Sequence, residues 1–315
     1  MIVKRNFHPV KVWQYIKRPM WFAMAWAAAV WGLHAATDAS ELYISFTPIG
    51  VLGSALAIFI AFRNNSAYGR WWEGRQIWGS LVNHSREYAR MIINFVDVCI
   101  RANPERATEM NAFKTQLIHR HIAFVHALRL HLRRQEDWEQ LKPLLSPEDY
   151  ERVVASNNKP NYINMLSGDH LRKGQDAHML EWYHTFQVEG NLTQFANHLG
   201  KCERIKNTPL PRQYDYFTRV FVLLFAALLP FGILGFFQSE TLLPLSWLSI
   251  PLCTVLSGVF VIMERTGAAN EDPFENQVTD VPLSALCNTI ERDLREMLGE
   301  SDLPPKMMPE NGYLY

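Results

Sequence analysis

The sequence has no excess of positive or negative charge, and it has few cysteines. Its 315 residues carry 31 Lys and Arg against 31 Asp and Glu. Nucleic-acid binders normally show a basic excess, so this balance argues against that class. The cysteines Cys99, Cys202, Cys253 and Cys287 are widely spaced and form no CxxC pair. They indicate a reducing compartment, and neither a zinc site nor a disulfide framework.

Motifs that carry enzymatic chemistry are also missing. The chain has no GxxxxGKS/T phosphate loop, no HExxH and no GxSxG. His119, His121, His126 and His131 cluster on one predicted helix, but no carboxylate lies among them to complete a metal site. Packed or solvated helical histidines, with some sensitivity to pH, are the better interpretation. We therefore expect no catalytic residue, no cofactor and no resident metal.

Charge is absent from four long stretches, at residues 19–37, 42–62, 220–238 and 241–263. Each is about 20 residues long, which is the length of helix that crosses a hydrocarbon core about 30 Å thick. Because the rest of the chain is polar, the mean hydropathy is only −0.11. The stretches form two hairpins, which favours four transmembrane helices over buried helices of a soluble protein. The first stretch does not resemble a cleaved signal peptide, since it lacks a small-residue cleavage site.

Basic residues flank these hairpins on one side only. They are frequent from Lys4 to Arg18 and from Arg63 to Arg75, whereas the hairpin connections carry only the acids Asp38, Glu41 and Glu240. The positive-inside rule therefore places both termini and the middle region in the cytoplasm.

These boundaries divide the chain into five predicted regions. In order they are a cytoplasmic arm (1–18), a first transmembrane hairpin (19–62), a cytoplasmic helical region (63–219), a second hairpin (220–263) and a cytoplasmic C-terminal region (264–315).

Apolar periodicity predicts further helices outside the hairpins. They cover about 68–100, 104–134, 176–205 and 282–298, with short helices and turns over 141–158 and prolines, including Pro160, as breakers. No repeat and no convincing strand pattern is present. The predicted fold class is an all-α membrane protein with a large cytoplasmic helical domain.

The second charge-free stretch has an unusual face. It is rich in glycine, alanine and serine, which let membrane helices pack closely. Ser54, Ile58 and Phe62 are four residues apart and share one side of the helix. On periodicity alone, a lipid-facing or packing stripe is favoured. The alternative is a pore lining, where copies around an axis would form a narrow hydrophobic constriction that gates by dewetting.

The segment that follows resembles a known family. Residues 62–79 read FRNNSAYGRWWEGRQIWG and contain the triplet Arg70, Trp71 and Trp72. This string strongly resembles the bestrophin family, especially its bacterial branch, where the second span runs into Arg-Asn-Asn and then Arg-Trp-Trp. Other similar segments are CERI and NTP within 202–209, DPF at 272–274 and DVPL at 280–283.

The resemblance implies a homopentameric ion channel with one central pore. The family's neck is lined by three apolar residues spaced four apart on the second span, and here these positions are Ser54, Ile58 and Phe62. Serine replaces a large apolar residue at the outermost ring, which should make that ring wider and wetter.

The resemblance also places residues beside the neck. Arg63, Asn64 and Asn65 follow Phe62 directly, so they would edge the neck on its cytoplasmic side. A second constriction is expected near the cytoplasmic exit, before Cys202.

Eukaryotic bestrophins are opened by calcium through an acidic cluster after the fourth span. Most of those acids are replaced here, which leaves Glu275 and Asp280 near each other, with Glu271 and Asp272 shortly before them. Calcium takes roughly six to eight oxygen ligands, so we expect no tight site of that kind. A weaker cation site is one interpretation of these residues, and a solvated acidic loop paired with arginines is the other.

The permeant ion is indicated only indirectly. Eukaryotic members pass chloride, whereas bacterial relatives favour monovalent cations. Asp38 and Glu41 lie on the predicted outer hairpin, and several copies would concentrate cations at the outer mouth. Arg63 would act in the opposite direction if it faced the pore. We predict passive conduction of small monovalent ions with cations favoured over chloride, and a chloride-selective channel of the same architecture is the alternative.

The expected partners are membrane lipid, the permeant ions and further copies of the chain, with no nucleic acid. The expected location is a bacterial inner membrane. A membrane-anchored scaffold or regulatory protein is the alternative from another class, and it would conduct no ions. A membrane-anchored enzyme would need a polar cleft with titratable groups in register, and no motif indicates one.

Overall fold

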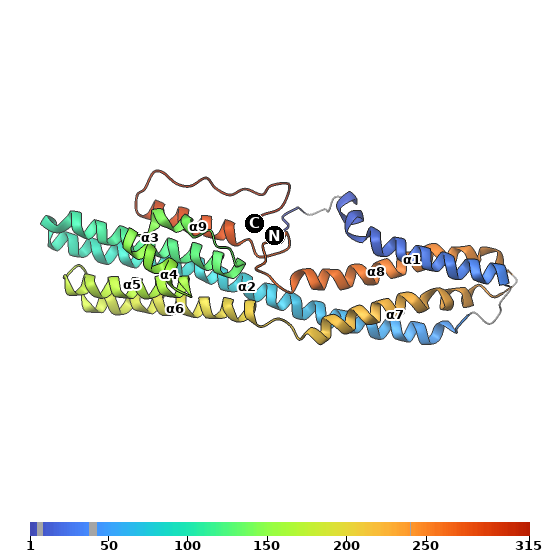
Figure 1. The fold of residues 1–315 in the computed structure, drawn as a ribbon. Helices are drawn as coiled ribbons and strands as arrows, with labels where there is room; N and C mark the ends of the chain where they lie inside the picture. Colours follow the sequence, from blue (N-terminus) through green and yellow to red (C-terminus); the bar gives the residue numbers. More distant parts are fainter. Residues whose placement is uncertain (5–8, 38–42, 240) are drawn as a thin grey trace. The chain divides into compact units, whose positions relative to one another are not determined.

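The computed structural model describes residues 1–4, 9–37, 43–239 and 241–315 (Figure 1). The described part is helical and contains no strand, apart from isolated bridges of Tyr313 with Ile2 and Glu310. The chain forms two compact units. Unit 1 comprises Met1–Val3, Trp71–Thr208 and Asp272–Tyr315, and unit 2 comprises Lys4–Arg70 and Pro209–Glu271.

Unit 2 is a helical bundle. Its elements are α1 (Pro9–Thr37), the first part of α2 (Phe46–Ala102), α7 (Arg212–Phe236), the 3₁₀ helix η3 (Leu243–Leu248) and α8 (Ser249–Asn270). Helix α1 packs on α8 and α7, and α7 also packs on α8. The core of the unit holds Leu56 and Ile60 from α2 together with Phe225 and Leu229 from α7.

Three helical stretches of the described residues are long and apolar enough to cross a membrane: Phe46–Ala102, Trp182–Phe236 and Leu243–Asn270. Helix α1 is not among them, although it is 29 residues long. Trp13, Trp21, Trp26, Trp31 and His34 lower its mean hydropathy. The structure thus supports three of the four predicted spans by length and composition, and a span at α1 stays a prediction.

Helix α2 runs through 57 residues without interruption. The predicted span ends at Phe62 and the next predicted helix begins at about Tyr68, and in the structure both belong to this single helix. No proline lies between these residues, and nothing else interrupts the backbone hydrogen bonds there. The last span also differs from its predicted range of 241–263, because α8 begins only at Ser249, after η3.

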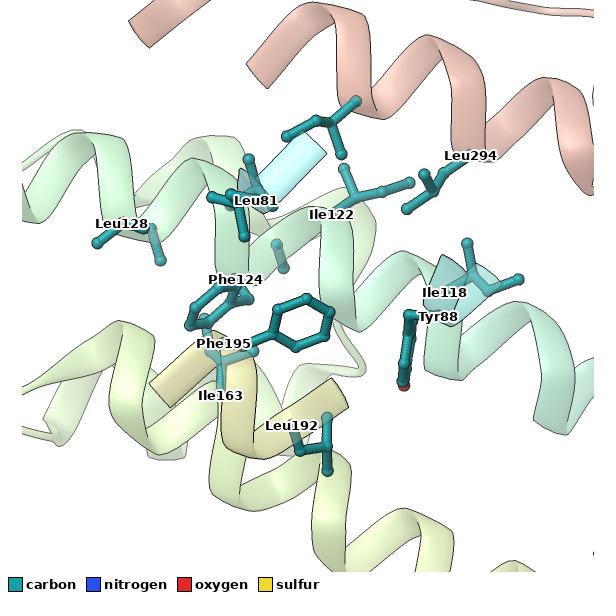
Figure 2. Packing of buried hydrophobic residues seen from close by; sticks show 14 of the residues in the cluster. Leu81, Tyr88, Ile118, Ile122, Phe124, Leu128, Ile163, Leu192, Phe195 and Leu294 are labelled. Carbon is teal, nitrogen blue, oxygen red and sulfur yellow. The ribbon is translucent and has the colours of Figure 1, made fainter. Parts of the chain in front are cut away.

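Unit 1 contains the rest of α2 and most of the remaining helices. They are η1 (Pro104–Arg106), α3 (Ala107–Arg133), η2 (Trp138–Leu144), α4 (Pro147–Ala155), α5 (Lys159–Asp176), α6 (Trp182–Asn207) and α9 (Leu283–Met297). Figure 2 shows their shared core. Tyr88 of α2, Phe124 of α3, Ile163 of α5, Phe195 of α6 and Leu294 of α9 are each at most 1% exposed. Their burial accounts for the periodicity seen in the sequence.

Helix α5 was not predicted, because Pro160 was interpreted as a breaker. In the structure Pro160 lies in the first turn of α5, where a missing N–H costs nothing. The Asn158 side chain caps this helix by accepting a hydrogen bond from the Asn161 N–H at 3.2 Å. The helix predicted over 176–205 accordingly begins later, at Trp182, after a turn in which His178 has a φ of 56°.

The two ends of the chain are paired within unit 1. The Val3 N–H donates to the Gly312 carbonyl at 2.9 Å, and the Leu314 N–H donates to the Met1 carbonyl at 2.9 Å. The Ala285 N–H, at the start of α9, donates to the Tyr315 carbonyl at 2.8 Å. Both ends therefore belong to the same unit as the middle of the chain.

The clustered histidines of α3 do not gather around one point. Three of them reach glutamates on other elements: His119 reaches Glu300 at 2.6 Å, His126 reaches Glu291 at 2.8 Å and His131 reaches Glu203 at 3.0 Å. Within the described residues, no group of three His, Cys, Asp or Glu side chains has a metal-binding arrangement.

His121, the fourth of these histidines, lies in the core of unit 1. The Ser85 hydroxyl donates a hydrogen bond to the Leu81 carbonyl at 2.7 Å. Its oxygen is therefore the acceptor in the hydrogen bond with His121 Nε2, at 2.8 Å. The ring stacks on Phe195 with centroids 4.1 Å apart. Burial lowers the pKa of His121 to about 3. Burial, followed by the charge of Arg120, likewise lowers the pKa of His170 to about 4.

The lowered pKa values of His121 and His170 predict that the stability of unit 1 falls in acid. Below pH 6.5 the unfolded chain binds protons that the folded chain excludes, so stability falls as the pH decreases toward about 4. Each such group contributes at most about 1.4 kcal/mol per pH unit. We expect His121→Asn to make the pH dependence of thermal unfolding shallower over this window, measured on the full chain in detergent.

His178→Asn is the matched control, since His178 is exposed and asparagine tolerates its left-handed backbone. Its pH slope should equal that of the parent. Equal slopes for both variants would contradict the assignment to His121.

Candidate functional site

The part of α2 in unit 2 has two opposite faces. Leu56 and Ile60 are at most 3% exposed and pack in the bundle. Ile58 and Phe62 are 59% and 70% exposed in the single chain. Ser54 is exposed as well, and a spacing of four residues puts it on the side of Ile58 and Phe62. The three predicted neck residues therefore form one continuous exposed strip, which we call the α2 strip.

Glycine permits close packing on the buried side of α2. A Cβ at Gly53 would lie 2.8 Å from the Phe225 ring of α7, and a Cβ at Gly232 of α7 would lie 2.5 Å from Ile49. Real Cβ atoms do not approach carbon this closely, so the Phe225 ring favours glycine at position 53, whereas a Cβ at position 232 would displace the end of the flexible Ile49 side chain. The small residues noted in the sequence thus serve, in part, the contact between α2 and α7.

The outermost residue of the α2 strip has a partly satisfied hydroxyl. Ser54 Oγ donates to the Gly50 carbonyl of the preceding turn at 3.0 Å. Its lone pairs stay exposed, so Ser54 is the polar position on a strip that is otherwise apolar at Ile58 and Phe62.

Arg63 does not share the exposed face. It is 2% exposed, and its guanidinium lies among three carboxylates, at 2.5 Å from Asp215, 3.6 Å from Glu264 and 3.6 Å from Glu271. It also donates to the Glu264 carbonyl at 3.2 Å. We expected Arg63 to edge the neck, but in the structure its side chain is buried within unit 2 and lies off the α2 strip. Consecutive helical residues diverge by about 100°, which turns Arg63 away from Phe62.

Further arginines balance these acids. Arg219 lies 3.1 Å from Asp215 and Arg212 lies 3.9 Å from Glu271. Together with Arg63 they match the three carboxylates in number.

Asn64 and Asn65, the other predicted edge residues, differ in their surroundings. Asn65 is exposed. Asn64 Nδ2 donates to the Met263 carbonyl of α8 at 2.9 Å. Its Oδ1 packs directly over Gly267, where an added Cβ would lie only 1.9 Å away. Asn64 thus fixes α2 against α8.

The Arg-Trp-Trp triplet is anchored through backbone carbonyls. Arg70 Nε donates to the Glu271 carbonyl at 2.8 Å in unit 2. In unit 1, Trp71 Nε1 donates to the Thr279 carbonyl at 3.0 Å, and the ring stacks on Trp72 with centroids 6.5 Å apart. These contacts tie the triplet to the segment after α8, which also resembles the family in sequence.

The predicted weak cation site is not assembled. Glu271 is paired with Arg63, and Glu275 lies 2.5 Å from Lys206. Asp280 is 2% exposed and accepts the Gln277 N–H at 3.0 Å. Burial raises the pKa of Asp280, against the backbone hydrogen bonds that it accepts. Asp272 is the fourth acid of the predicted site. Among the described residues, none of the four belongs to a group of three side chains that could hold a metal ion.

The predicted outer-mouth acids, Asp38 and Glu41, lie outside the described residues. The described site is therefore the α2 strip, supported from behind by the Arg63 cluster and by the contact of Asn64 with Gly267.

The sequence matches one family over most of its length. The model of the bacterial and fungal bestrophin proteins matches residues 7–296. The chain belongs to the bestrophin family. This membership confirms the resemblance carried by the Arg70 triplet and the neighbouring motifs.

Named bestrophin relatives agree with this assignment. The chain is 34% identical over 280 residues to the voltage-dependent anion channel-forming protein YneE of Escherichia coli strain K12, covering 87% of this chain and 84% of the relative. It is 30% identical over 253 residues to a voltage-dependent anion channel-forming protein of Nostoc sp., covering 78% and 77%. The expectation that the protein is not an enzyme is confirmed by these relatives.

A solved bestrophin structure has the same fold. A bacterial bestrophin homolog from Klebsiella pneumoniae aligns with a TM-score of 0.80 at 26% identity, covering 91% of this chain and all of that chain. The helical architecture described above is therefore that of the family.

The contact of α2 with α8 yields a prediction about Gly267. Gly267→Ala should cost about 1–3 kcal/mol, because the new methyl displaces Asn64 and breaks its hydrogen bond to Met263. The measurement is thermal unfolding of the full chain in detergent.

Gly258→Ala on the same helix is the control, because its Cβ would meet nothing closer than 3.6 Å. It should be neutral or slightly stabilising. Adding Asn64→Ala should remove most of the penalty of Gly267→Ala. A full penalty in that double variant would show that Asn64 is not the obstacle.

Proposed function

We propose that the chain forms an ion channel in which several copies, five by resemblance to the family, surround a pore lined by the α2 strip. The observation that carries the proposal is the exposure of Ile58 and Phe62 on a helix whose opposite face is buried. Large apolar side chains on such a strip need cover from lipid or from further copies. Membership of the bestrophin family favours further copies around a pore.

The chemistry of the strip fits passive conduction through a neck. Ser54, Ile58 and Phe62 carry no charge, so rings of these side chains would hold a narrow, poorly wetted passage. The polar Ser54 ring would be the widest and wettest of the three. Ions would pass without a coupled reaction, and no cofactor enters the proposal.

The arrangement in the membrane follows the sequence. We infer four transmembrane helices, including α1, in a bacterial inner membrane with both ends of the chain in the cytoplasm. The pairing of Met1–Val3 with residues 312–314 supports this orientation, because the middle of the chain belongs to the same unit.

We further propose that cations are favoured over chloride. Arg63 is paired with carboxylates and lies off the α2 strip, which removes the main sequence argument for anions. Asp38 and Glu41 then remain to concentrate cations at the outer mouth. Selection of chloride is the second candidate, and the names of the relatives as anion channel-forming proteins favour it.

The neck proposal predicts a gain of flux. Ile58→Ala combined with Phe62→Ala widens two rings and removes a dewetted barrier, so ion flux from proteoliposomes should rise by about tenfold or more. Val255→Ala on α8 is a matched control, because Val255 is 58% exposed and lies outside the proposed pore lining. An unchanged flux in the folded double variant would refute the neck, and no current from the parent would favour a membrane-anchored scaffold.

Ion choice is tested by reversal potentials in planar bilayers under a salt gradient. We expect a value near the cation's, and Asp38→Asn with Glu41→Gln should reduce cation conductance mainly well below about 0.15 M salt, where screening is weak. A reversal potential near that of chloride would establish the second candidate. Equal loss at all salt concentrations would assign the two acids a structural role instead.

A further inference from the structure

A polar cavity of about 380 Å³ lies within unit 1, and none of its lining residues belongs to the α2 strip. Its walls come from α3, the end of η2, the start of α4 and one side of α5. Basic and titratable side chains predominate in the lining, and they include His119, Arg120, Arg152, His170 and Lys173.

Arg120 has more hydrogen-bond donors than partners. It is 7% exposed, and its Nη2 lies 2.5 Å from Asp149 Oδ2. Its Nε and Nη1 are buried without a hydrogen-bond partner. These two nitrogens carry three N–H groups, and leaving buried charged donors unpaired is costly. Asp149 thus satisfies only part of the guanidinium that lines the cavity.

His170, which also lines the cavity, has a second unpaired atom. Its ring stacks on Phe113 with centroids 4.8 Å apart, and its Nε2 is buried without a partner. The charge of Arg120 contributes to the low pKa of His170, so the two groups interact electrostatically. An anion bound to Arg120 would offset that charge and favour a proton on His170.

The other charged groups around His170 and Arg120 leave a positive excess. Arg152 lies 3.6 Å from Glu148, and both are on α4. His119 is already paired with Glu300. Lys173, one turn beyond His170 on α5, is exposed and lines the cavity. Because Asp149 offsets the charge of Arg120, and Glu148 that of Arg152, Lys173 supplies the net positive charge of the lining.

We propose that this cavity binds the phosphate group of a small phosphorylated molecule. A phosphate has three outer oxygens, enough to accept from Arg120 and Lys173 and to share a proton with His170. A carboxylate has only two. The volume exceeds that of one phosphate group, so part of an organic ester fits beside it.

The site is tested by calorimetric titration of the full chain in detergent with inorganic phosphate, glycerol phosphate and acetate at matched ionic strength. We expect phosphate to bind more tightly than acetate. Stronger binding of glycerol phosphate would identify an organic ester as the source, and stronger binding of inorganic phosphate would identify the free ion. No heat and no thermal stabilisation with either phosphate would overturn the proposal.

Arg120→Lys is the principal variant. It keeps the charge and the ion pair with Asp149 but loses the additional donors, so phosphate affinity should fall roughly tenfold or more. Arg172→Gln on α5 is the control, because Arg172 is exposed, lies 3.4 Å from Asp176 and does not line the cavity. Equal affinity for the parent and folded Arg120→Lys would refute the site.

His170→Asn keeps the test decisive if Arg120→Lys does not fold. It should weaken phosphate binding and reduce the proton uptake that accompanies it, measured by titration in buffers of different ionisation heat. Unchanged affinity and proton uptake would contradict the proposal. Because no conduction is measured, failure here leaves the channel proposal unaffected.

Discussion

The burial of one arginine fixes the rotation of α2 in its bundle. A guanidinium that is 2% exposed costs several kcal/mol unless it is paired, and Arg63 has Asp215 of α7 and Glu264 of α8 within 3.6 Å. Rotating α2 so that Arg63 faced outward would strand those carboxylates. Since a helix turns about 100° per residue, holding Arg63 inside also holds Phe62 outside. The exposure of the α2 strip is thus a consequence of a buried ion cluster, and not of the strip's own composition.

Sequence reasoning found the strip but not what holds it in position. The spacing of Ser54, Ile58 and Phe62 is a local property, and any helix over these residues aligns them on one side. The partners of Arg63 lie more than 150 positions further along the chain, on two other helices. Periodicity contains no information about such pairs. The histidines of α3 illustrate the same limit, because their glutamates come from α6, α9 and the residues after α9.

The helices of unit 1 were predictable where apolar periodicity was strong, and their ends were less so. The helices over 68–100 and 104–134 were predicted because apolar residues repeat there at helical spacing, and such residues, Trp78 and Leu117 among them, are fully buried in the structure. Helix α5 was missed because proline can either end a helix or lie in the first turn of one. It ends a helix when it follows one, but in the first turn it costs no hydrogen bond, and only the Asn158 cap distinguishes the two cases at Pro160.

The position of Arg63 also constrains how ions of one sign can be selected. A charged ring at the neck would act strongly, because little water lies there to screen it. With Arg63 paired and the α2 strip uncharged, no described side chain of the strip supplies such a ring. In the proposed channel, selection would then come from groups at the mouths, where salt screens them over about 8–10 Å, or from the cost of dehydrating each ion in the apolar neck. The first mechanism weakens as salt rises and the second does not, so the salt dependence of selectivity distinguishes them.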